Sequence, residues 1–209
     1  MMKNSMYDED AQPTKTTNVS IGTAQTNEDK SIYKEIDYGF SIKDSIIYIH
    51  GDIVLGLLFD FISKVRTILE NRTTDTDAPI TVLINSDGGD VYEALGLIDY
   101  MKSQKVKFNV IARGRAMSAA ALILACATGT RAASKMTSIM VHEISTANQG
   151  KASDIRANAD HLEELEELTF QLLAEHTKQD TDFWKKSARK DFFFNAAKAK
   201  ELGLIDTII

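Results

Sequence analysis

The chain has 209 residues, of which 44% are hydrophobic and 26% charged, so it can bury one substantial core, and we expect one domain plus a tail. Its net charge of −6 opposes binding to phosphate backbones, which excludes nucleic acid as a partner. The sequence contains no apolar run near the roughly 20 residues that cross a bilayer and no apolar centre of a secretory signal, so we expect a cytoplasmic protein without membrane contact.

The first 30 residues are rich in Thr, Asn, Ser, Asp and Lys and have almost no aliphatic side chains. Such a segment cannot bury enough surface to offset the entropy of ordering. We expect 1–30 to be a flexible tail, a removable propeptide or an adaptor-binding arm, which composition does not separate. Residues 31–209 are expected to form the single folded domain.

From Ile46 onward, apolar stretches alternate between strand and helix patterns. Strands are expected at 46–49, 81–84 and 106–112, helices at 54–69 and 91–103, and a polar loop at 71–77. This strand–helix–strand alternation predicts an α/β domain with a largely parallel sheet.

The second half of the chain continues the pattern. The uniformly apolar run 119–127 predicts a buried helix, in which Cys126 is interpreted as core packing. Residues 137–142 predict a strand, and 153–176 a helix about 36 Å long that could project against another subunit. The chain closes with an expected helix at 196–202, between Asn195 as N-cap and Gly203 as stop, and a strand at 204–209.

Two turns could carry chemistry. Ser118 follows a turn of small residues and precedes the apolar helix, so its hydroxyl should lie at a helix N-terminus, which favours a developing negative charge. Gly88 and Gly89 follow a strand and can leave a backbone N–H free for a ligand, although such a pair more often marks a turn that has no function. An oxyanion hole could be built from that amide and the amide of Ala119.

A nucleophilic serine needs a base, and the chain has four histidines. His161 and His176 fall on the polar part of the long helix and are interpreted as surface residues. His50 and His142 each end a strand, and either could be a base or a half-buried, hydrogen-bonded residue. Periodicity does not choose between them.

A set of short motifs occurs in order along the chain. They are Asn85–Gly89, Gly114–Ala119, Ile139–His142, Gln149–Ile155 and Asp191–Ala197, ending in Gly203–Asp206. Together they resemble the proteolytic subunit of the Clp protease, ClpP, over about Ile46 to Ile209.

The resemblance implies a serine endopeptidase that cleaves unfolded polypeptides, without metal or cofactor. It makes Ser118 the nucleophile, His142 the base and Asp191 the third triad member, with oxyanion amides from Gly89 and Ala119. It also implies a strand that aligns the substrate, made of Ser145, Thr146, Ala147, Asn148 and Gln149. Three nearby acids, Asp87, Asp90 and Glu143, are then interpreted as solvated or structural.

The fold implied by the resemblance is the crotonase-like ClpP fold, with repeated β-β-α units, a largely parallel sheet and a protruding handle at about 145–177. The implied assembly is a homo-oligomer of heptameric rings, stacked as a tetradecamer around a chamber, or a mixed ring with other ClpP-like subunits. An AAA+ unfoldase is the implied partner.

The chain departs from the family pattern beside the site. Asp87 stands where the family usually has Pro, Glu143-Ile144 where it typically has Gln-Pro, and Lys190 where an arginine often helps couple the rings. Lysine keeps the charge but loses the planar fork of arginine. Loop geometry beside His142 is therefore expected to differ.

The surface that would receive the unfoldase is also altered. Its implied positions hold Thr81, Leu83, Ser103, Ile111, Arg113, Ser134 and Ile209. Three small polar residues and a cation should weaken an apolar pocket, because burial is worth roughly 25 cal/mol per Å² of apolar area.

Other functions stay open on the sequence. A ClpP-like subunit could fill a ring position without cleaving anything, although all three triad residue types are present. An acyl-CoA hydratase or isomerase on the related crotonase fold would rely on carboxylates for proton transfer, which the Ser, His and Asp set disfavours. A Ser–Lys peptidase lacks a lysine at a matching position.

Overall fold

The computed structural model describes residues 38–72, 77–147 and 149–209. The expected tail, 1–30, and the middle of the expected loop 71–77 lie outside the described residues. Within the described part, no helix is both long and apolar enough to cross a membrane.

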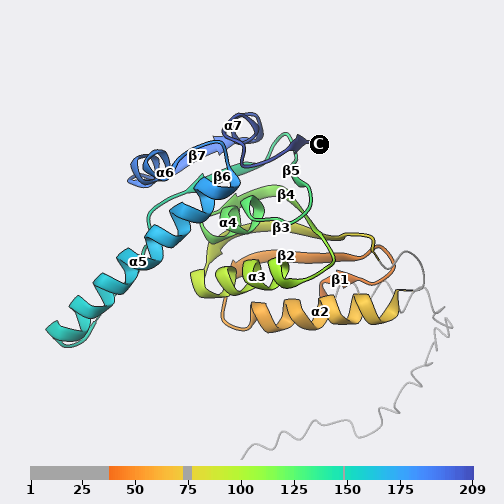
Figure 1. Cartoon of the computed structure of the whole chain (residues 1–209), viewed down its shortest axis with the longest axis horizontal. Coiled ribbons are helices and arrows are strands. Elements are labelled where there is room, and N and C mark those ends of the chain that lie inside the picture. The colour runs from red at the N-terminus through yellow and green to blue at the C-terminus, as the bar shows by residue number, and fades with distance from the viewer. Residues whose placement is uncertain (1–37, 73–76, 148) are drawn as a thin grey trace, which may run out of the picture.

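Strands and helices alternate along most of the described chain (Figure 1). The described strands are β1 (Phe40–Ser41), β2 (Ile46–Ile53), β3 (Ile80–Gly89), β4 (Phe108–Met117), β5 (Arg131–Ala133), β6 (Ser138–Val141), β7 (Phe192–Asn195) and β8 (Thr207–Ile208). The described helices are α2 (Leu57–Asn71), α3 (Val91–Ser103), α4 (Ala119–Ala125), α5 (Ala152–His176), α6 (Thr181–Ala188) and α7 (Ala196–Leu202).

All described strands belong to one sheet. Its main path runs β1-β2-β3-β4-β5-β8, and β6 pairs with β4 and with β7. The pairs β1–β2 and β6–β7 are antiparallel and the others are parallel. The expected α/β architecture with a largely parallel sheet is confirmed.

One face of the sheet carries the core. In β3, Ile80, Val82 and Ile84 are buried, whereas the alternate residues Thr81 and Leu83 are half-buried and lie on the opposite face. All seven residues of α4 are buried, and so is Cys126 directly after it, as expected for a core cysteine. The continuous apolar run is therefore explained by a helix enclosed on every side.

The helix expected at 54–69 begins three residues late, at Leu57. Val54 and Leu55 are apolar but 58% and 87% exposed, so their spacing does not reflect core packing. Gly56 takes a left-handed conformation with φ 101°, and the carboxylate of Glu93 in α3 accepts a hydrogen bond from the amide of Leu58 at 2.8 Å. The first turn of α2 is thus capped from a distant element.

The expected strands at 81–84 and 106–112 are both too short. β3 continues to Gly89 and β4 to Met117, because pairing resumes after an irregularity, with Ser86 opposite Ala116. The last strand is shorter than expected, since Leu204 and Ile205 are buried in the core before β8 begins. The sequence analysis missed β1, β5, β7 and α6.

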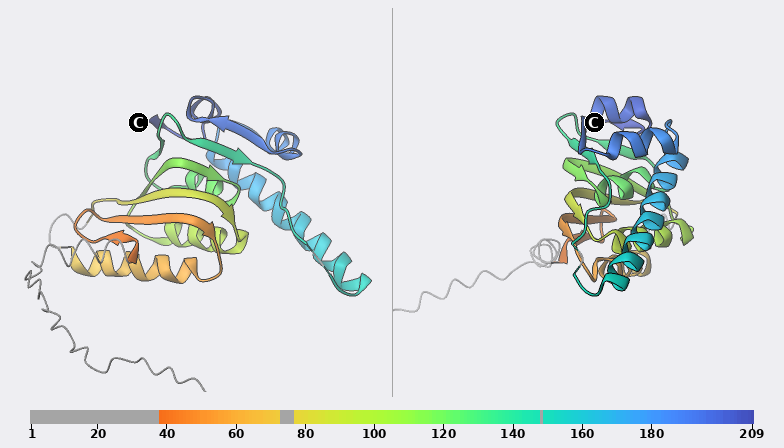
Figure 2. Two further views of the ribbon diagram at one scale, coloured as in Figure 1. Left: turned by 180° about the vertical axis from the view of Figure 1, so that it is seen from behind. Right: turned by 90° about the vertical axis from the view of Figure 1, so that its left-hand side faces the viewer.

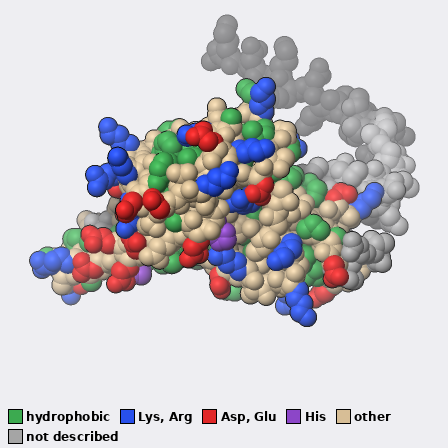
Figure 3. Space-filling view, turned by 45° about the horizontal axis from the view of Figure 1, so that its top comes forward, with side chains coloured by type: hydrophobic (Ala, Val, Ile, Leu, Met, Phe, Trp, Pro, Cys, Tyr) green, Lys and Arg blue, Asp and Glu red, His purple; other side chains and the backbone are tan. Residues whose placement is uncertain are grey.

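The long helix projects from the body as expected. Figures 1 and 2 show the first half of α5 extending beyond the sheet and its helices. Residues 152–161 are exposed, and Figure 3 shows acidic and basic side chains mixed along this arm. The second half returns to the body, where Leu165, Phe170 and Leu173 are buried.

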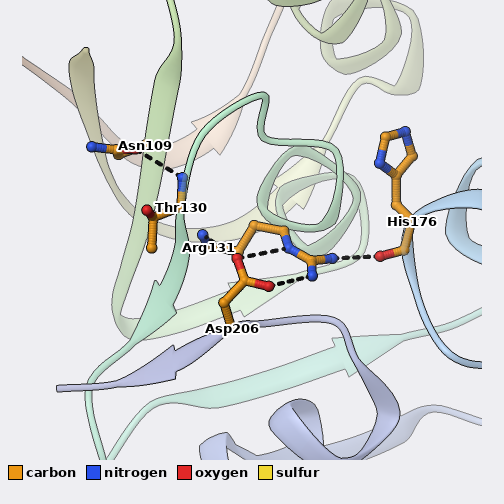
Figure 4. A network of polar contacts seen from close by, with 5 residues as sticks. All are labelled: Asn109, Thr130, Arg131, His176 and Asp206. Carbon is orange, nitrogen blue, oxygen red and sulfur yellow. Dashed lines mark hydrogen bonds and ion pairs between the residues drawn. The ribbon is translucent and has the colours of Figure 1, made fainter. Parts of the chain in front are cut away.

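A polar network ties the end of α5 to the far edge of the sheet (Figure 4). Arg131 of β5 forms an ion pair with Asp206, which precedes β8, and donates to the backbone oxygen of His176 at the end of α5. The side chain of Arg131 is 17% exposed. This arginine therefore holds together three segments that are far apart in the sequence.

Candidate active site

Ser118 occupies a strained turn between β4 and α4. Its φ of 54° and ψ of −124° are rare for a residue with a side chain and cost of order 1–3 kcal/mol. The turn is held on both sides, because its amide donates to Met140 of β6 at 2.8 Å and its carbonyl accepts from Ala121 at 2.9 Å. Strain of this kind clusters at functional sites, where it aims a side chain.

His142 lies directly beside this serine. It follows β6, and Met117 of β4 stands opposite Met140 of β6 in parallel register, so both strands deliver their next residues to the same edge. His142 Nε2 lies 2.8 Å from Ser118 Oγ, which is hydrogen-bonding distance. The structure thus brings together the two residues expected to be base and nucleophile.

Asp191 reaches the other side of the imidazole. It precedes β7, whose antiparallel pairing places Phe192 opposite Val141 and therefore Asp191 next to His142. Asp191 Oδ1 is 3.8 Å from His142 Nδ1, longer than a hydrogen bond, and its side chain is 60% exposed. The Asp191 carboxylate is therefore near the imidazole of His142 but is not hydrogen-bonded to it and remains accessible to solvent.

Gly88, near the end of β3, lies against Ser118. A Cβ on Gly88 would come within 2.8 Å of the Ser118 Cβ and 3.1 Å of the Ala119 nitrogen, so only glycine fits. The amide of Gly88 already donates to Ser86 Oγ at 3.0 Å. Gly89 and Ala119, the expected oxyanion donors, both line the cavity in front of the serine.

A cavity of about 440 Å³ opens beside Ser118. Part of its lining consists of apolar residues from α4 and α5, namely Leu122, Leu162, Phe170 and Leu173. The segment after His142 also lines the cavity, including Ile144, Ser145 and Thr146. An apolar cavity with a few polar groups at one end suits a substrate side chain seated next to the hydroxyl.

The nearby acids have structural partners. Asp87 forms a double hydrogen bond with Arg115, at 2.9 and 2.8 Å. Asp90 caps α3 by accepting from the amides of Tyr92 and Glu93 at 2.8 and 3.2 Å. This agrees with their interpretation as solvated or structural residues.

The structure separates the four histidines. His50 is exposed on β2, and His161 is exposed on α5, where its Nε2 lies 2.8 Å from the hydroxyl of Tyr92. Burial lowers the pKa of His176, so that this residue is not the solvated surface group expected. Among the histidines, His142 makes the contact with Ser118.

The other expected positions fall in two places. Ser145, Thr146, Ala147 and Gln149 lie in a segment without regular secondary structure, and Asn148 lies outside the described residues. On the open sheet face, Leu83 stands opposite Ile111, with Thr81 and Arg113 on the same two strands. The remaining docking positions are Ser103 at the end of α3, Ser134 after β5 and Ile209 after β8.

One residue near the site was missed by the sequence analysis. Glu166 of α5 accepts a hydrogen bond from the amide of Ile144 at 2.9 Å. The acid lies among several others on the helix, and no sequence signal separates it from them. Within the described residues, no group of three His, Cys, Asp or Glu side chains is placed to hold a metal.

The comparisons with known proteins agree on one family. The Clp protease family model matches residues 29–209. A Clp protease proteolytic subunit 1 of Prochlorococcus marinus is 36% identical over 146 residues, covering 69% of this chain and 75% of that protein. A subunit 2 of Frankia casuarinae is 32% identical over 176 residues, covering 82% and 78%, and a subunit 2 of Parasynechococcus marenigrum is 37% identical over 146 residues, covering 69% and 74%. The family model covers most of the chain, and the strained serine turn and projecting helix fit it. The protein therefore belongs to the Clp protease family and has its fold.

Proposed function

We propose that this Clp-family serine endopeptidase cleaves unfolded polypeptides with Ser118 as nucleophile, His142 as general base and Asp191 as the group that orients the base. The observation that carries the proposal is the 2.8 Å contact between His142 Nε2 and Ser118 Oγ, made at a strained turn beside a cavity. Nucleophile and base within hydrogen-bonding reach are the signature of an activated serine.

The reaction follows from this geometry. His142 Nε2 takes the proton of Ser118 as Oγ attacks the scissile carbonyl, and later gives it to the leaving amine. The amides of Gly89 and Ala119 donate to the oxyanion of the tetrahedral intermediate. Water then hydrolyses the acyl-enzyme by the same proton path. Asp191 stabilises the imidazolium from the Nδ1 side.

The substrate would lie extended along 145–149. The described residues of that segment, Ser145, Thr146, Ala147 and Gln149, belong to no strand, so their amides and carbonyls would be open to pairing with a peptide. A side chain next to the scissile bond would enter the cavity lined by Leu122, Leu162 and Phe170. We therefore expect a preference for apolar residues there.

The relatives are named ATP-dependent Clp protease proteolytic subunits, and we propose a similar assembly for this chain. Two stacked heptameric rings, a tetradecamer, would confine the site to a chamber, with α5 at the contact between rings. Ile155 and Leu168 on α5 are 41% and 44% exposed and would be buried there. A mixed ring with other ClpP-like subunits is the alternative. A reducing compartment such as the cytoplasm suits the lone thiol, Cys126.

An AAA+ unfoldase would dock on the open sheet face. Leu83 and Ile111 stand side by side there, but Thr81 and Arg113 share their strands. Arg113 is exposed, and a buried cation without a partner is costly. We propose that docking on a homo-oligomer is weak, or that other subunits of a mixed ring supply it.

A second candidate is a ring subunit with little activity of its own. The 3.8 Å separation between Asp191 and His142, with Asp191 largely exposed, favours it. Against it, Ser118 and His142 are in contact, which a subunit that had lost its chemistry would not need to keep. The crotonase-type hydratase has no supporting observation.

The test is labelling with a fluorophosphonate probe, combined with native mass measurement. The wild type should be labelled at Ser118, and Ser118→Ala should not be labelled at all. His142→Ala should assemble normally but be labelled very slowly, since the base is gone. If the protein assembles into a ring but is not labelled, it is an inactive ring subunit. If a monomer is labelled, the proposal that the site works inside a ring-shaped chamber is wrong.

A further inference from the structure

The segment after His142 is held by two hydrogen bonds. The amide of Glu143 donates to the carbonyl of Ala188 at 3.1 Å, three residues before Asp191. The amide of Ile144 donates to Glu166 Oε1 at 2.9 Å. The first bond ties the residue after the base to the last residue of α6, the helix that precedes Asp191, and the second ties the next residue to the handle helix α5.

The second bond lies at the cavity. Ile144 lines the cavity, and so do Thr169 and Phe170, which follow Glu166 by about one turn of α5. Glu166 itself is half-buried. Its carboxylate therefore links α5 to the segment directly after His142.

We propose that Glu166 is a positioning residue for the peptidase reaction: through the amide of Ile144 it holds the segment that carries His142 and aligns the substrate. The inference rests on the proposed function of Ser118 and His142. A carboxylate that accepts from a backbone amide makes a short, charge-assisted hydrogen bond, stronger than one between neutral groups. A proline at 144 would have no N–H to donate, so this hydrogen bond requires a residue other than proline, as Ile144 is.

Neighbouring charges keep the helix in place around Glu166. Glu167 forms an ion pair with Lys185 of α6, and the Glu167 hydrogen bond raises the pKa of Lys185, with a smaller contribution from the charge of Glu166. The hydroxyl of Thr169 donates to the Glu166 carbonyl at 2.8 Å. α5 is thus anchored to α6, which leads into Asp191, and Glu166 links α5 to the segment after His142.

The experiment compares Glu166→Ala, Glu166→Gln and the matched control Glu163→Ala in the assembled full-length protein. Glu163 is an exposed acid on the same helix, one turn away. For a fluorogenic peptide, Glu166→Ala should lower kcat/KM by about tenfold through both a lower kcat and a higher KM, because base and substrate segment shift together. Glu166→Gln keeps an acceptor oxygen and should recover most of this loss, and the control should stay within about twofold.

Hydrogen exchange provides the direct readout. In Glu166→Ala the amides of 143–146 should exchange faster, while those of β3 and β4 keep their protection. If the alanine variant does not fold, Ile144→Pro, which deletes the amide donor together with the isoleucine side chain, takes its place, and Ile144→Ala, which keeps the donor, is its control: only the proline variant should show the kinetic loss expected for Glu166→Ala. Unchanged kcat/KM and unchanged exchange in a folded variant would overturn the proposal.

The same labelling assay separates this inference from the proposed function. If wild-type Ser118 is not labelled, the peptidase assignment fails. If the wild type is labelled, Ser118→Ala is not, and Glu166→Ala is labelled as fast as the wild type, only the role of Glu166 fails.

Discussion

At the scale of single residues, the two contacts of His142 within the triad differ in length. Ser118 Oγ and His142 Nε2 are in hydrogen-bonding contact, whereas Asp191 remains 3.8 Å from His142 Nδ1 and is mostly exposed to solvent. A solvated carboxylate at that distance orients an imidazole only weakly, because water screens its charge.

We therefore expect the triad residues to differ in their effect on kcat. Asp191→Ala should lower kcat by about 10- to 100-fold, and His142→Ala by about 10⁴-fold or more. Peptide hydrolysis by the assembled variants measures both, with Asp182→Ala as the control for an exposed acid of the same region. Equal losses for Asp191→Ala and His142→Ala would show that the open contact closes in the working enzyme.

At the scale of elements, the network of Figure 4 joins β5, the end of α5 and the segment before β8. The hydrogen bond and charge of Arg131 hold the pKa of Asp206 below its ordinary value, against a smaller opposing effect of burial. The ordinary, unfolded pKa of an aspartate is about 3.9. A lowered pKa in the folded state contributes stability that is present above the unfolded pKa and is lost as the pH falls through the folded pKa.

Asp206→Asn should therefore be less stable than the wild type at about pH 7, and the difference should shrink as the pH falls below about 4. Urea midpoints of the two proteins across this range provide the measurement. Asp99→Asn, which changes an exposed acid of α3, should show no such pH-dependent gap. A gap that stays constant with pH would mean that Asp206 acts through its shape and not its charge.

At the scale of the whole molecule, the proposed assembly depends on two surfaces of the chain. The α5 arm projects from the body, and the open face of the sheet leaves Leu83 and Ile111 half-buried with Arg113 beside them. In the proposed assembly, the first surface would meet a second ring, and the second would receive a hydrophobic loop tip of an unfoldase at reduced affinity.

Replacing Arg113 by Leu should strengthen binding of a synthetic peptide that carries such a loop tip. About 60 Å² of additional apolar burial corresponds to roughly 1.5 kcal/mol, or about tenfold in Kd. Fluorescence anisotropy on the assembled ring measures it, and Arg66→Leu on the exposed side of α2 is the control. If the wild type already binds as tightly as Arg113→Leu, the docking surface is not impaired.

Local chemistry determined much of the fold from the sequence alone. The bounds of α3 and α7 are those expected, because Asp90 and Asn195 accept hydrogen bonds from the first turns of their helices and Gly203 ends α7 in a left-handed conformation. α5 begins one residue earlier than expected. Ser118 was placed correctly at the start of the buried helix α4, whereas the turn expected before it is the end of strand β4.

Only the tertiary structure decided which distant residues meet. β5 and β7, with three and four residues, carry too little pattern to be seen, and they form because neighbouring strands pair with them. The choice of His142 among four histidines, the approach of Asp191 and the bond from Ile144 to Glu166 all depend on pairing across long stretches of chain. Capping and periodicity act within a few residues, whereas a site assembled from β4, β6, α5 and β7 depends on sheet register, which no local pattern encodes.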